Sequence, residues 1–413
     1  MLLTEPRPEH KPQVSVVLLA YNHLDYTKQC YESLIAHTDG VDYELITVDN
    51  GSTDGTAEYF DSLPHKKKLR FEENIGVDRA INRGLQLGEG KYVLNLSNDI
   101  VATDHWLKNL VTVMESDERI AMAVPVCGFS SNRQQVNLPY ETLEQLHALA
   151  DRRNRSNPRL WEDRMKLVTY TCLFRAKAIA DAGWFDEDFN PGAYDDDAIS
   201  FKLRRMGWRL ILAGDTYVHH YGSVTFNAEY EKNNLPQRNR TLFIKKFGVD
   251  SWAAAHIDMD VVNLHWYKRQ GPVSILGLGG SCGSTLLQIK NMYRRIGVED
   301  VAIDYLADAP HTLADLATVC RKSMYGPYQS ISDQFPGPYD LIVVESATDG
   351  FADISGLYGE LCALLPGDGQ LITTATETTL PAIRETVEAR GLRLANEAKG
   401  YYFRFDKEQT SVV

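Results

Sequence analysis

Carboxylate and amide side chains gather in four short segments of the first hundred residues, where they could bind a nucleotide and a divalent cation. Amide and hydroxyl groups can hydrogen-bond a base and a ribose, and carboxylate oxygens are ligands of hard cations. Each segment taken alone could be only a turn or a helix cap, since Asp, Asn, Ser and Gly dominate both. The four segments are residues 20–22 (AYN), 48–55 (VDNGSTDG), 73–77 (ENIGV) and 96–99 (LSND).

A run of three acids stands farther along the chain. Asp195, Asp196 and Asp197 directly precede apolar residues that recur at helical spacing. This spacing puts Asp196 on the inward face at the start of a helix and makes Asp195 the better N-cap. A carboxylate that faces a pocket can take a proton from a hydroxyl group. The alternative is that the acids only cap the helix and favour its dipole.

Two adjacent histidines follow the next predicted strand, residues 210–213. His219 and His220 come shortly before Gly222. Imidazole is a common metal ligand, so the pair could complete a cation site. They could also be surface residues.

The elements that must position these residues alternate between strand and helix, which predicts an α/β domain with a mostly parallel sheet. Apolar, β-rich runs predict the strands, and the stretches between them predict helices. Ligands of such sheets bind at the carboxyl ends of the strands, where residues 20–22, 48–55 and 96–99 fall. The predicted strands are 14–20, 43–48, 69–72 and 91–96, and the predicted helices are 25–37, 57–62 and 78–87.

In this order, the motifs resemble the family 2 inverting glycosyltransferases of the GT-A fold. The matching stretches include 48–56 (VDNGSTDGT), 73–85 (ENIGVDRAINRGL) and 96–100 (LSNDI), and the resemblance covers about residues 13–250. It implies a nucleotide-sugar-binding domain in which Ala20, Tyr21 and Asp49 lie around the base and ribose. The full set of candidate nucleotide-binding residues is Ala20, Tyr21, Asn22, Asp49, Asn50, Asn74, Gly76 and Asn98.

The same resemblance implies which residues bind the metal and which residue is the general base. Asp99 is the last acid of a metal-binding motif whose first position is Ser97 here. A histidine of the family completes the site, and the spacing favours His220, with His219 close behind. The expected cation is Mn²⁺ or Mg²⁺. The general base maps onto Asp196 of the Asp195–Asp196 pair.

The implied reaction moves a sugar from a nucleoside-diphosphate sugar to an acceptor hydroxyl of a glycan or glycoconjugate. One displacement inverts the anomeric carbon, so no covalent nucleophile is needed. The acceptor could be a growing polysaccharide, a lipid-linked glycan or a protein side chain. A binding or scaffold protein built on degenerate folds is the competing hypothesis, which retention of Asp99 and Asp196 disfavours.

A second alternation of predicted strands and helices begins at residues 273–283 (VSILGLGGSCG). A dinucleotide fingerprint would need glycine where Cys282 stands, which disfavours NAD. The stretch instead resembles class I S-adenosylmethionine-dependent methyltransferases over about residues 271–405, with Ile275 where that family has an acid. A Rossmann-like methyltransferase-type domain is expected, one that is non-catalytic or acceptor-docking, with an active domain of a bifunctional enzyme as the alternative. Its candidate cofactor residues are Gly277, Gly279, Gly283 and Asp304, the last at an expected strand end.

The expected organisation is therefore a loose arm, two α/β domains and a helical connection. The ranges are 1–13 for the arm, 14–225 for the GT-A domain, 226–270 for a helical appendage or linker, and 271–413 for the second domain.

Composition limits the classes of protein and the cellular locations that are expected. The net charge of −13 argues against general nucleic-acid binding, which needs basic surface. No apolar run approaches the roughly 18 residues of a membrane span, and the N-terminus lacks the pattern of a secretory signal. The six cysteines are scattered, which disfavours a disulfide framework or a cysteine-based zinc site. A cytoplasmic protein is expected, one that meets any lipid-linked acceptor at the inner face of the membrane.

Overall fold

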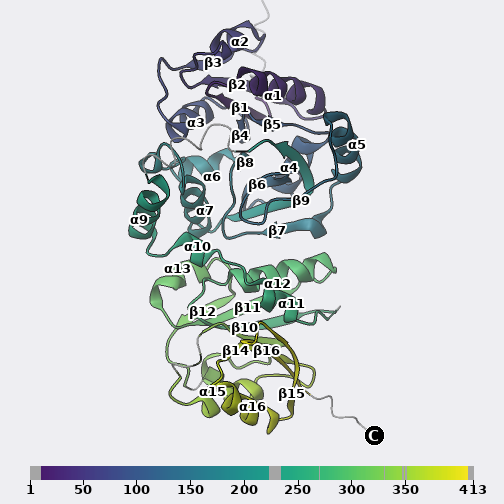
Figure 1. Cartoon of the computed structure of the whole chain (residues 1–413), viewed down its shortest axis with the longest axis vertical. Helices are drawn as coiled ribbons and strands as arrows, with labels where there is room; N and C mark the ends of the chain where they lie inside the picture. Colours follow the sequence, from purple (N-terminus) through teal and green to yellow (C-terminus); the bar gives the residue numbers. More distant parts are fainter. Residues whose placement is uncertain are drawn as a thin grey trace, which may run out of the picture. The chain divides into compact units, whose positions relative to one another are not determined.

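The computed structural model shows two compact units, each built on its own sheet (Figure 1). The first unit extends to Glu162 and resumes over Lys166–Phe243, and the second comprises Asp163–Met165 and the chain from Ile244 onward. The predicted mixed α/β architecture, with a second sheet, is confirmed. The residues that the structure describes are 11–222, 234–268, 270–329, 331–346, 348 and 351–407.

The first sheet has a parallel half and a mixed half. Its order is β3-β2-β1-β4-β8-β6-β9-β5, with β7 paired to β9. Strand β1 pairs in parallel with β2 and β4, whereas β8 runs antiparallel to both β4 and β6. The strands are β1 Val14–Ala20, β2 Tyr43–Asp49, β3 Lys67–Arg70, β4 Tyr92–Ser97, β5 Ile100–Val101, β6 Ile120–Cys127, β7 Trp161–Asp163, β8 Thr171–Arg175 and β9 Arg209–His220.

The central strands are apolar because helices cover both faces of the sheet and bury their side chains. Every residue of β6 is buried, and the apolar side chains of β1 and β4 belong to the same core. Strand β3 lies two residues earlier than the expected 69–72, where it pairs with β2. The helices are α1 Leu24–His37, α2 Thr56–Ser62, α3 Val77–Gln86, α4 Trp106–Ser116, α5 Leu143–Arg153, α6 Ala176–Asp181, α7 Asp195–Arg205 and α9 Leu235–Phe247, with short 3-10 turns at Pro158–Leu160 and Glu187–Phe189.

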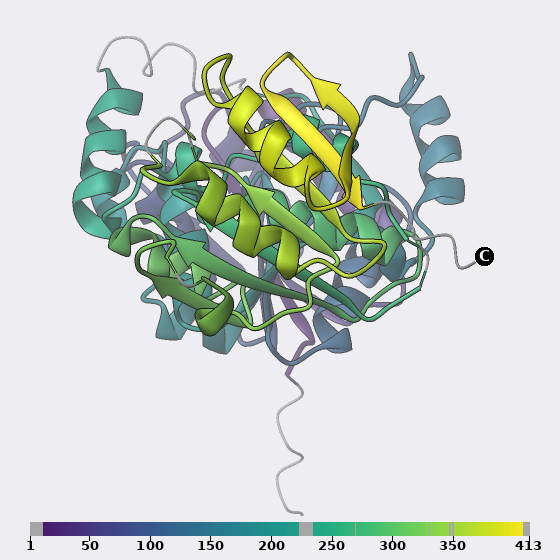
Figure 2. The same cartoon turned by 90° about the horizontal axis from the view of Figure 1, so that it is seen from below.

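The first strand of the second sheet along the chain, β10, is an inner strand, and later strands lie on both sides of it. Its order is β12-β11-β10-β13-β14-β16-β15. The C-terminal hairpin of β15 and β16, yellow in Figure 2, joins β14 in antiparallel fashion. The remaining pairs are parallel. After β12 the chain returns to the other side of β10, so the strand order reverses between β10 and β13. The strands are β10 Val273–Gly279, β11 Val301–Ala307, β12 Lys322–Tyr325, β13 Leu341–Val344, β14 Gln370–Thr374, β15 Leu392–Ala398 and β16 Tyr402–Lys407.

Side chains of β10 pack into two separate hydrophobic cores, one on each face of this sheet. Val273 and Ile275 join one cluster, and Leu276 and Leu278 join the other. The helices of the unit are α10 Ser251–Ala254, α11 Met259–Leu264, α12 Ser284–Arg295, α13 Leu313–Leu316, α14 Ile331–Gln334, α15 Ile354–Ala363 and α16 Leu380–Glu388, with a 3-10 turn at Pro310–Thr312.

Each of the four expected segments includes residues outside the described part of the chain. These are residues 1–10 of the expected arm, 223–225 of the expected GT-A domain, 226–233 and 269 of the expected linker, and 330, 347, 349–350 and 408–413 of the expected second domain. In the described part of the chain, no helix combines the length and the apolar character that crossing a bilayer requires.

Candidate functional site

The ends of β1 and β2 are joined by side chain to backbone hydrogen bonds. The Asn22 N–H donates to Ser52 Oγ at 2.8 Å, and the Thr53 N–H donates to Asn22 Oδ1 at 2.8 Å. Asn22 itself has a left-handed backbone with φ 57°, a conformation that asparagine tolerates better than most residues. Asn22 thus ties the two predicted motifs into one loop pair next to Ala20 and the half-exposed Tyr21.

Amide side chains connect the next two segments. Asn50 Nδ2 donates to Asn74 Oδ1 at 3.0 Å, and Asn50 Oδ1 accepts from the Ile75 N–H at 3.0 Å. Asn74 Oδ1 also accepts from the Gly76 N–H at 2.8 Å. The structure therefore brings Asn50, Asn74 and Gly76 together, and their amide groups are engaged with one another.

Two glycines permit these close approaches. A Cβ on Gly51, whose φ is +82°, would lie 2.4 Å from the carbonyl carbon of Glu73. A Cβ on Gly76, whose φ is +89°, would lie 2.1 Å from the side-chain amide of Asn190. Larger residues at these positions would be strained and would push the segments apart.

Asp49 ends β2 in a buried position. Its side chain is 1% exposed and accepts from the Ser52 N–H at 3.3 Å. Asn98 is also enclosed, with Nδ2 donating to the carbonyl of Asn22 at 3.1 Å and to Thr27 Oγ1 at 2.9 Å. The sequence motifs thus converge at the carboxyl ends of β1, β2 and β4.

Asp99 and His220 face each other because two strands pair in a fixed register. Strand β5 pairs antiparallel with the end of β9, so Ile100 lies opposite His220 and the Tyr221 N–H donates to the Asp99 carbonyl at 3.1 Å. The Asp99 Oδ2 to His220 Nε2 distance is 3.3 Å, and each side chain is 13% exposed. Backbone pairing thus holds a carboxylate and an imidazole together.

His219 takes the other face of the same strand. Successive residues of a strand point to opposite sides, and the Nδ1 of His219 is hydrogen-bonded with Tyr140 Oη. Burial, followed by the neighbouring His220, lowers the pKa of His219. The structure therefore joins Asp99 with His220 and turns His219 away.

His220 is oriented as a metal-binding histidine is in other proteins. Its Nδ1–H donates to the Phe129 carbonyl at 2.7 Å, which leaves Nε2 directed at Asp99. Such a second hydrogen bond to a carbonyl fixes the ring and its tautomer. Burial alone would lower the pKa of His220, but hydrogen bonds with Asp99 and Cys127 raise the pKa to about 10. A positive charge is therefore already favoured beside Asp99.

Three carboxyl groups meet at the start of α7. Asp78 of α3 shares a hydrogen bond with Asp195, and Thr169 Oγ1 donates to Asp196 Oδ1 at 2.6 Å. Burial, followed by Asp196, raises the pKa of Asp78 to about 8. Burial also raises the pKa of Asp195 and Asp196, with Asp78 the next cause for Asp195 and Asp195 the next cause for Asp196. Like charges this close favour retention of protons.

Asp197 differs from its two neighbours because a cation compensates it. Its Oδ2 lies 3.0 Å from Lys166 Nζ, and the two side chains are 9% and 14% exposed. Asp197 is therefore ion-paired, although its charge still contributes to the raised pKa of Asp195 and Asp196.

The prediction that Asp195 caps α7 is wrong. Asp195 is the first residue of the helix, and the N-cap is Tyr194, which makes no side-chain capping bond. Ala193 and Tyr194 both have a left-handed backbone, with φ 70° and 69°. The chain enters the helix from that conformation, which leaves Asp195 within the first turn and available to Asp78.

Two adjacent residues connect the acid cluster with the Asp99–His220 pair. Thr169 bonds to Asp196, and the ring of Tyr170 stacks on the ring of His220 with centroids 5.1 Å apart. Thr169 and Tyr170 are consecutive residues, so one short backbone segment contacts both groups. The Ser97 N–H also donates to the Tyr170 carbonyl at 3.2 Å, which fixes this segment to the end of β4.

Asn239 of α9 holds the loop that precedes α7. Its Nδ2 lies 2.8, 2.8 and 2.9 Å from the carbonyl oxygens of Phe189, Gly192 and Ala193, and the side chain is fully buried. This residue positions the entry to Asp195 and Asp196 from a distant part of the sequence.

Asn239→Ala is expected to lower the free energy of unfolding by about 1–3 kcal/mol, because buried carbonyl groups lose their donor. Denaturant unfolding of the full chain measures the change. Gln237→Ala, at an exposed position of the same helix, is the matched control and should stay within about 0.5 kcal/mol of the parent. Equal stabilities of the two variants would remove Asn239 from this role.

In the second unit, the chain's own side chains surround the predicted cofactor turn. A Cβ on Gly277 would lie 2.4 Å from the Tyr305 ring, and one on Gly279 would lie 2.8 Å from Ser346 Oγ. Gly283 is the N-cap of α12, with φ 83°. Glu345 follows β13 and accepts from Ser281 and Tyr305 at 2.7 and 2.8 Å.

The prediction that Asp304 stands at a strand end is wrong. It lies in the middle of β11, 3% exposed, and pairs with Arg321 at 2.5 Å and with Tyr339 Oη at 2.8 Å. The structure therefore does not bring it to the glycine turn. Asp304 lines a pocket of about 510 Å³ together with Ser274 and Asp340, near the amino ends of β10 and β13.

Residues 15–181 match the family model described as Glycosyl transferase family 2. Over this stretch the first unit is similar to glycosyl transferase family 2. An uncharacterized glycosyltransferase of Haemophilus influenzae is 30% identical over 116 residues, which are 27% of this chain and 36% of its own length. The uncharacterized glycosyltransferase YibD of Escherichia coli is 33% identical over 110 residues, which are 26% of this chain and 31% of its own. The chain thus spans about a third of the length of these relatives.

A solved structure also resembles part of the chain. Mannosyltransferase PcManGT from Pyrobaculum calidifontis, in complex with GDP-Man and Mn²⁺, is 18% identical with a TM-score of 0.41, over 60% of this chain and 66% of that one.

Sequence reasoning missed two residues that contact the acids of α7. Asp78 stands in the first turn of α3, where an acid is usually explained by the helix dipole. Thr169 precedes a strand and carries no motif. Only the fold shows that both contact the acids of α7.

Proposed function

We propose that the first unit is a metal-dependent inverting glycosyltransferase that moves a sugar from a nucleoside-diphosphate sugar to an acceptor hydroxyl. The observation that supports the proposal is the Thr169–Tyr170 segment, whose two residues contact Asp196, a carboxyl group of raised pKa, and His220 of the Asp99–His220 pair. In this proposal Asp196 would be the base and the Asp99–His220 pair the cation site that the reaction needs.

Asp99 and His220 would hold the divalent cation. Their donor atoms are a carboxylate oxygen and an imidazole nitrogen, which suit Mn²⁺, and phosphate oxygens would supply further ligands. When bound, the ion offsets the negative charge that develops on the leaving diphosphate. The hydrogen bond from His220 to Phe129 fixes the imidazole for this task.

Asp196 would take the proton from the acceptor hydroxyl as the oxygen attacks the anomeric carbon. The hydroxyl of Thr169 orients the carboxylate, and the half-buried position of Asp196 leaves it reachable from solvent. Burial, followed by the nearby carboxyl group of Asp195, raises the pKa of Asp196, and a base of raised pKa accepts a proton more readily. One displacement then inverts the configuration.

The donor end would lie against the loops that follow β1 and β2. We propose contacts from Ala20, Tyr21 and Asp49, with Asn22, Asn50, Asn74, Gly76 and Asn98 shaping the loops. The acceptor would be a glycan, a lipid-linked glycan or a protein, and a lipid-linked acceptor would be met at the inner face of the membrane.

A panel of nucleoside-diphosphate sugars with and without Mn²⁺ tests this proposal. A donor at 100 times its dissociation constant should stabilise the protein by about 2.7 kcal/mol, and the shift should require the metal. A hydrolysis assay on the same donors then shows whether the bound sugar reacts. Absence of any donor-dependent shift across the panel would favour the scaffold hypothesis.

We propose that the second unit is a methyltransferase-like domain that is non-catalytic or serves in acceptor docking. Two observations support the lack of cofactor binding. The glycine turn is lined by Tyr305, Ser346 and Glu345, and Asp304 faces a pocket elsewhere. The bifunctional alternative is favoured by the reversal of strand order between β10 and β13, where α/β sheets commonly bind ligands.

S-adenosylmethionine is expected to bind the full chain weakly or not at all. Calorimetric titration measures the affinity, with adenosine as the control ligand. A saturable heat signal for S-adenosylmethionine, absent for adenosine and accompanied by a melting shift, would overturn the non-catalytic proposal and support the bifunctional one.

A further inference from the structure

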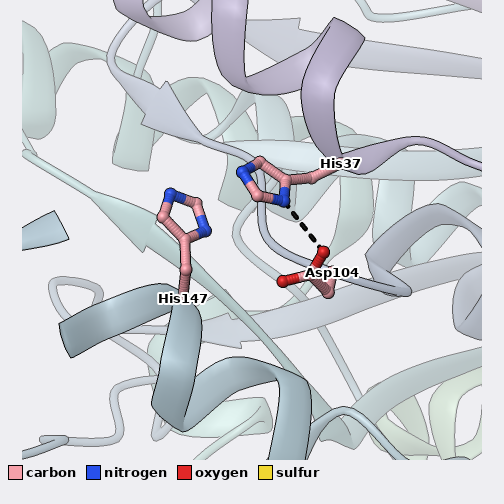
Figure 3. Close-up of side chains that lie close together, drawn as sticks. All are labelled: His37, Asp104 and His147. Carbon is pink, nitrogen blue, oxygen red and sulfur yellow. Dashed lines mark hydrogen bonds and ion pairs between the residues drawn. The ribbon is translucent and has the colours of Figure 1, made fainter. Parts of the chain in front are cut away.

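Three side chains with metal-binding groups meet away from the proposed donor site. His37 is the last residue of α1, Asp104 lies between β5 and α4, and His147 is on α5. One donor atom from each lies within 4.8 Å of the others. Figure 3 shows the two imidazole rings beside the Asp104 carboxylate, each arriving from a different element.

The hydrogen bonding of this cluster is incomplete. His37 Nδ1 and Asp104 Oδ1 are 2.9 Å apart, and the two imidazole rings stack with centroids 3.9 Å apart. His147 Nδ1 is buried and has no hydrogen-bond partner among the residues that the structure describes. A buried polar atom without a partner is costly and calls for an explanation, and a missing ligand is one.

The surrounding backbone holds the three elements in place. Asn154, the C-cap of α5, donates to the Asp104 carbonyl at 2.8 Å and to Thr103 Oγ1 at 3.0 Å. Trp106 Nε1 of α4 donates to Thr38 Oγ1, directly after α1, at 3.0 Å. These bonds fix the ends of all three elements, which is what a preorganised binding site needs.

The donor set selects the class of ion. Two imidazole nitrogens and one carboxylate oxygen suit Zn²⁺ and similar transition metals, whereas Mg²⁺ and Ca²⁺ prefer oxygen alone. Three protein ligands leave a fourth position for water. All three residues are half-buried, which leaves the cluster open to an ion from solvent.

We propose that His37, Asp104 and His147 bind one Zn²⁺-class ion that fastens α5 to the end of α1. This site is separate from the cation proposed at Asp99 and does not depend on the transferase reaction. Because the ion would bind the folded chain, its effect is on stability.

The test measures bound zinc in the full chain carrying Asp99→Asn, which removes the donor-site carboxylate. After equilibration with Zn²⁺ and dialysis, elemental analysis should find one zinc per chain, and Zn²⁺ should raise the melting temperature. His147→Ala and the near-isosteric Asp104→Asn should each weaken zinc binding at least tenfold. His105→Ala, next to Asp104 but outside the cluster, should bind zinc as the parent does.

Two results would overturn the site. One is a parent chain that retains no zinc and shows no melting shift. The other is a His147→Ala chain that retains the same zinc at the same affinity. Failure of sugar transfer would affect neither result, since the readouts are metal content and melting temperature.

Discussion

Replacing Asp196 by asparagine is expected to lower turnover by about 10²–10⁴-fold while donor binding persists. Asparagine keeps the shape of the side chain and can still bond with Thr169, but it cannot accept the proton. Initial rates at saturating donor, together with donor affinity by calorimetry, separate the two effects. Asp181→Asn, an exposed carboxylate paired with Lys177, is the control and should keep parental activity.

The opposite pattern would assign Asp196 another role. If donor affinity collapses in Asp196→Asn while turnover at saturation stays normal, Asp196 contributes to binding and another group is the base.

The pH profile gives a second reading of the same residue. A base works only when deprotonated, so kcat/KM should rise with pH through the raised pKa of Asp196 and then level off. Because burial and then Asp195 raise that pKa, Asp195→Asn should lower the pKa of Asp196 and move the rise to lower pH. An unchanged profile would place the base elsewhere.

Asp99→Asn is expected to abolish metal-dependent transfer with the fold intact. A cation that loses its carboxylate ligand no longer stabilises the leaving diphosphate, an effect of several kcal/mol, so the rate should fall about 10²-fold or more. The backbone carbonyl of Asp99 still accepts from Tyr221, which preserves the β5–β9 pairing. Rates across a Mn²⁺ titration and a melting curve measure both parts.

The two histidines provide the matched comparison for Asp99. His220→Ala should also raise the Mn²⁺ requirement, because its Nε2 faces Asp99. His219→Ala should affect the Mn²⁺ requirement less, since His219 is bonded with Tyr140 on the other face. Full activity of Asp99→Asn would remove the residue from the mechanism.

The sequence could predict the strand-end motifs because apolar runs mark the buried strands and polar residues follow them directly. The sequence could not predict the position of Asp304 within its strand. Gly277 and Gly279 are themselves part of β10, which extends through Gly279. Strand β11 pairs along that full length, so Asp304 falls inside the ladder.

The acid cluster could not be predicted without the tertiary structure. Nothing in the types of Ala193 and Tyr194 indicates a left-handed entry to α7, so the cap was misplaced. His37, Asp104 and His147 share no local spacing, and only the packing of α1, α4 and α5 brings them together. The choice between His219 and His220, in contrast, follows from the two-residue period of a strand once β9 is known to extend that far.

The edge strands of both sheets bear on how copies of the chain meet. Strand β3 closes one side of the first sheet with the sequence KKLR, and β12 closes one side of the second with KSMY. Each is four residues long, and short, lysine-bearing edges discourage another strand from adding to the ladder. Although the chain is acidic overall, lysine side chains stand on both of these edge strands. Edge-to-edge aggregation through these two strands is therefore disfavoured during refolding at high concentration.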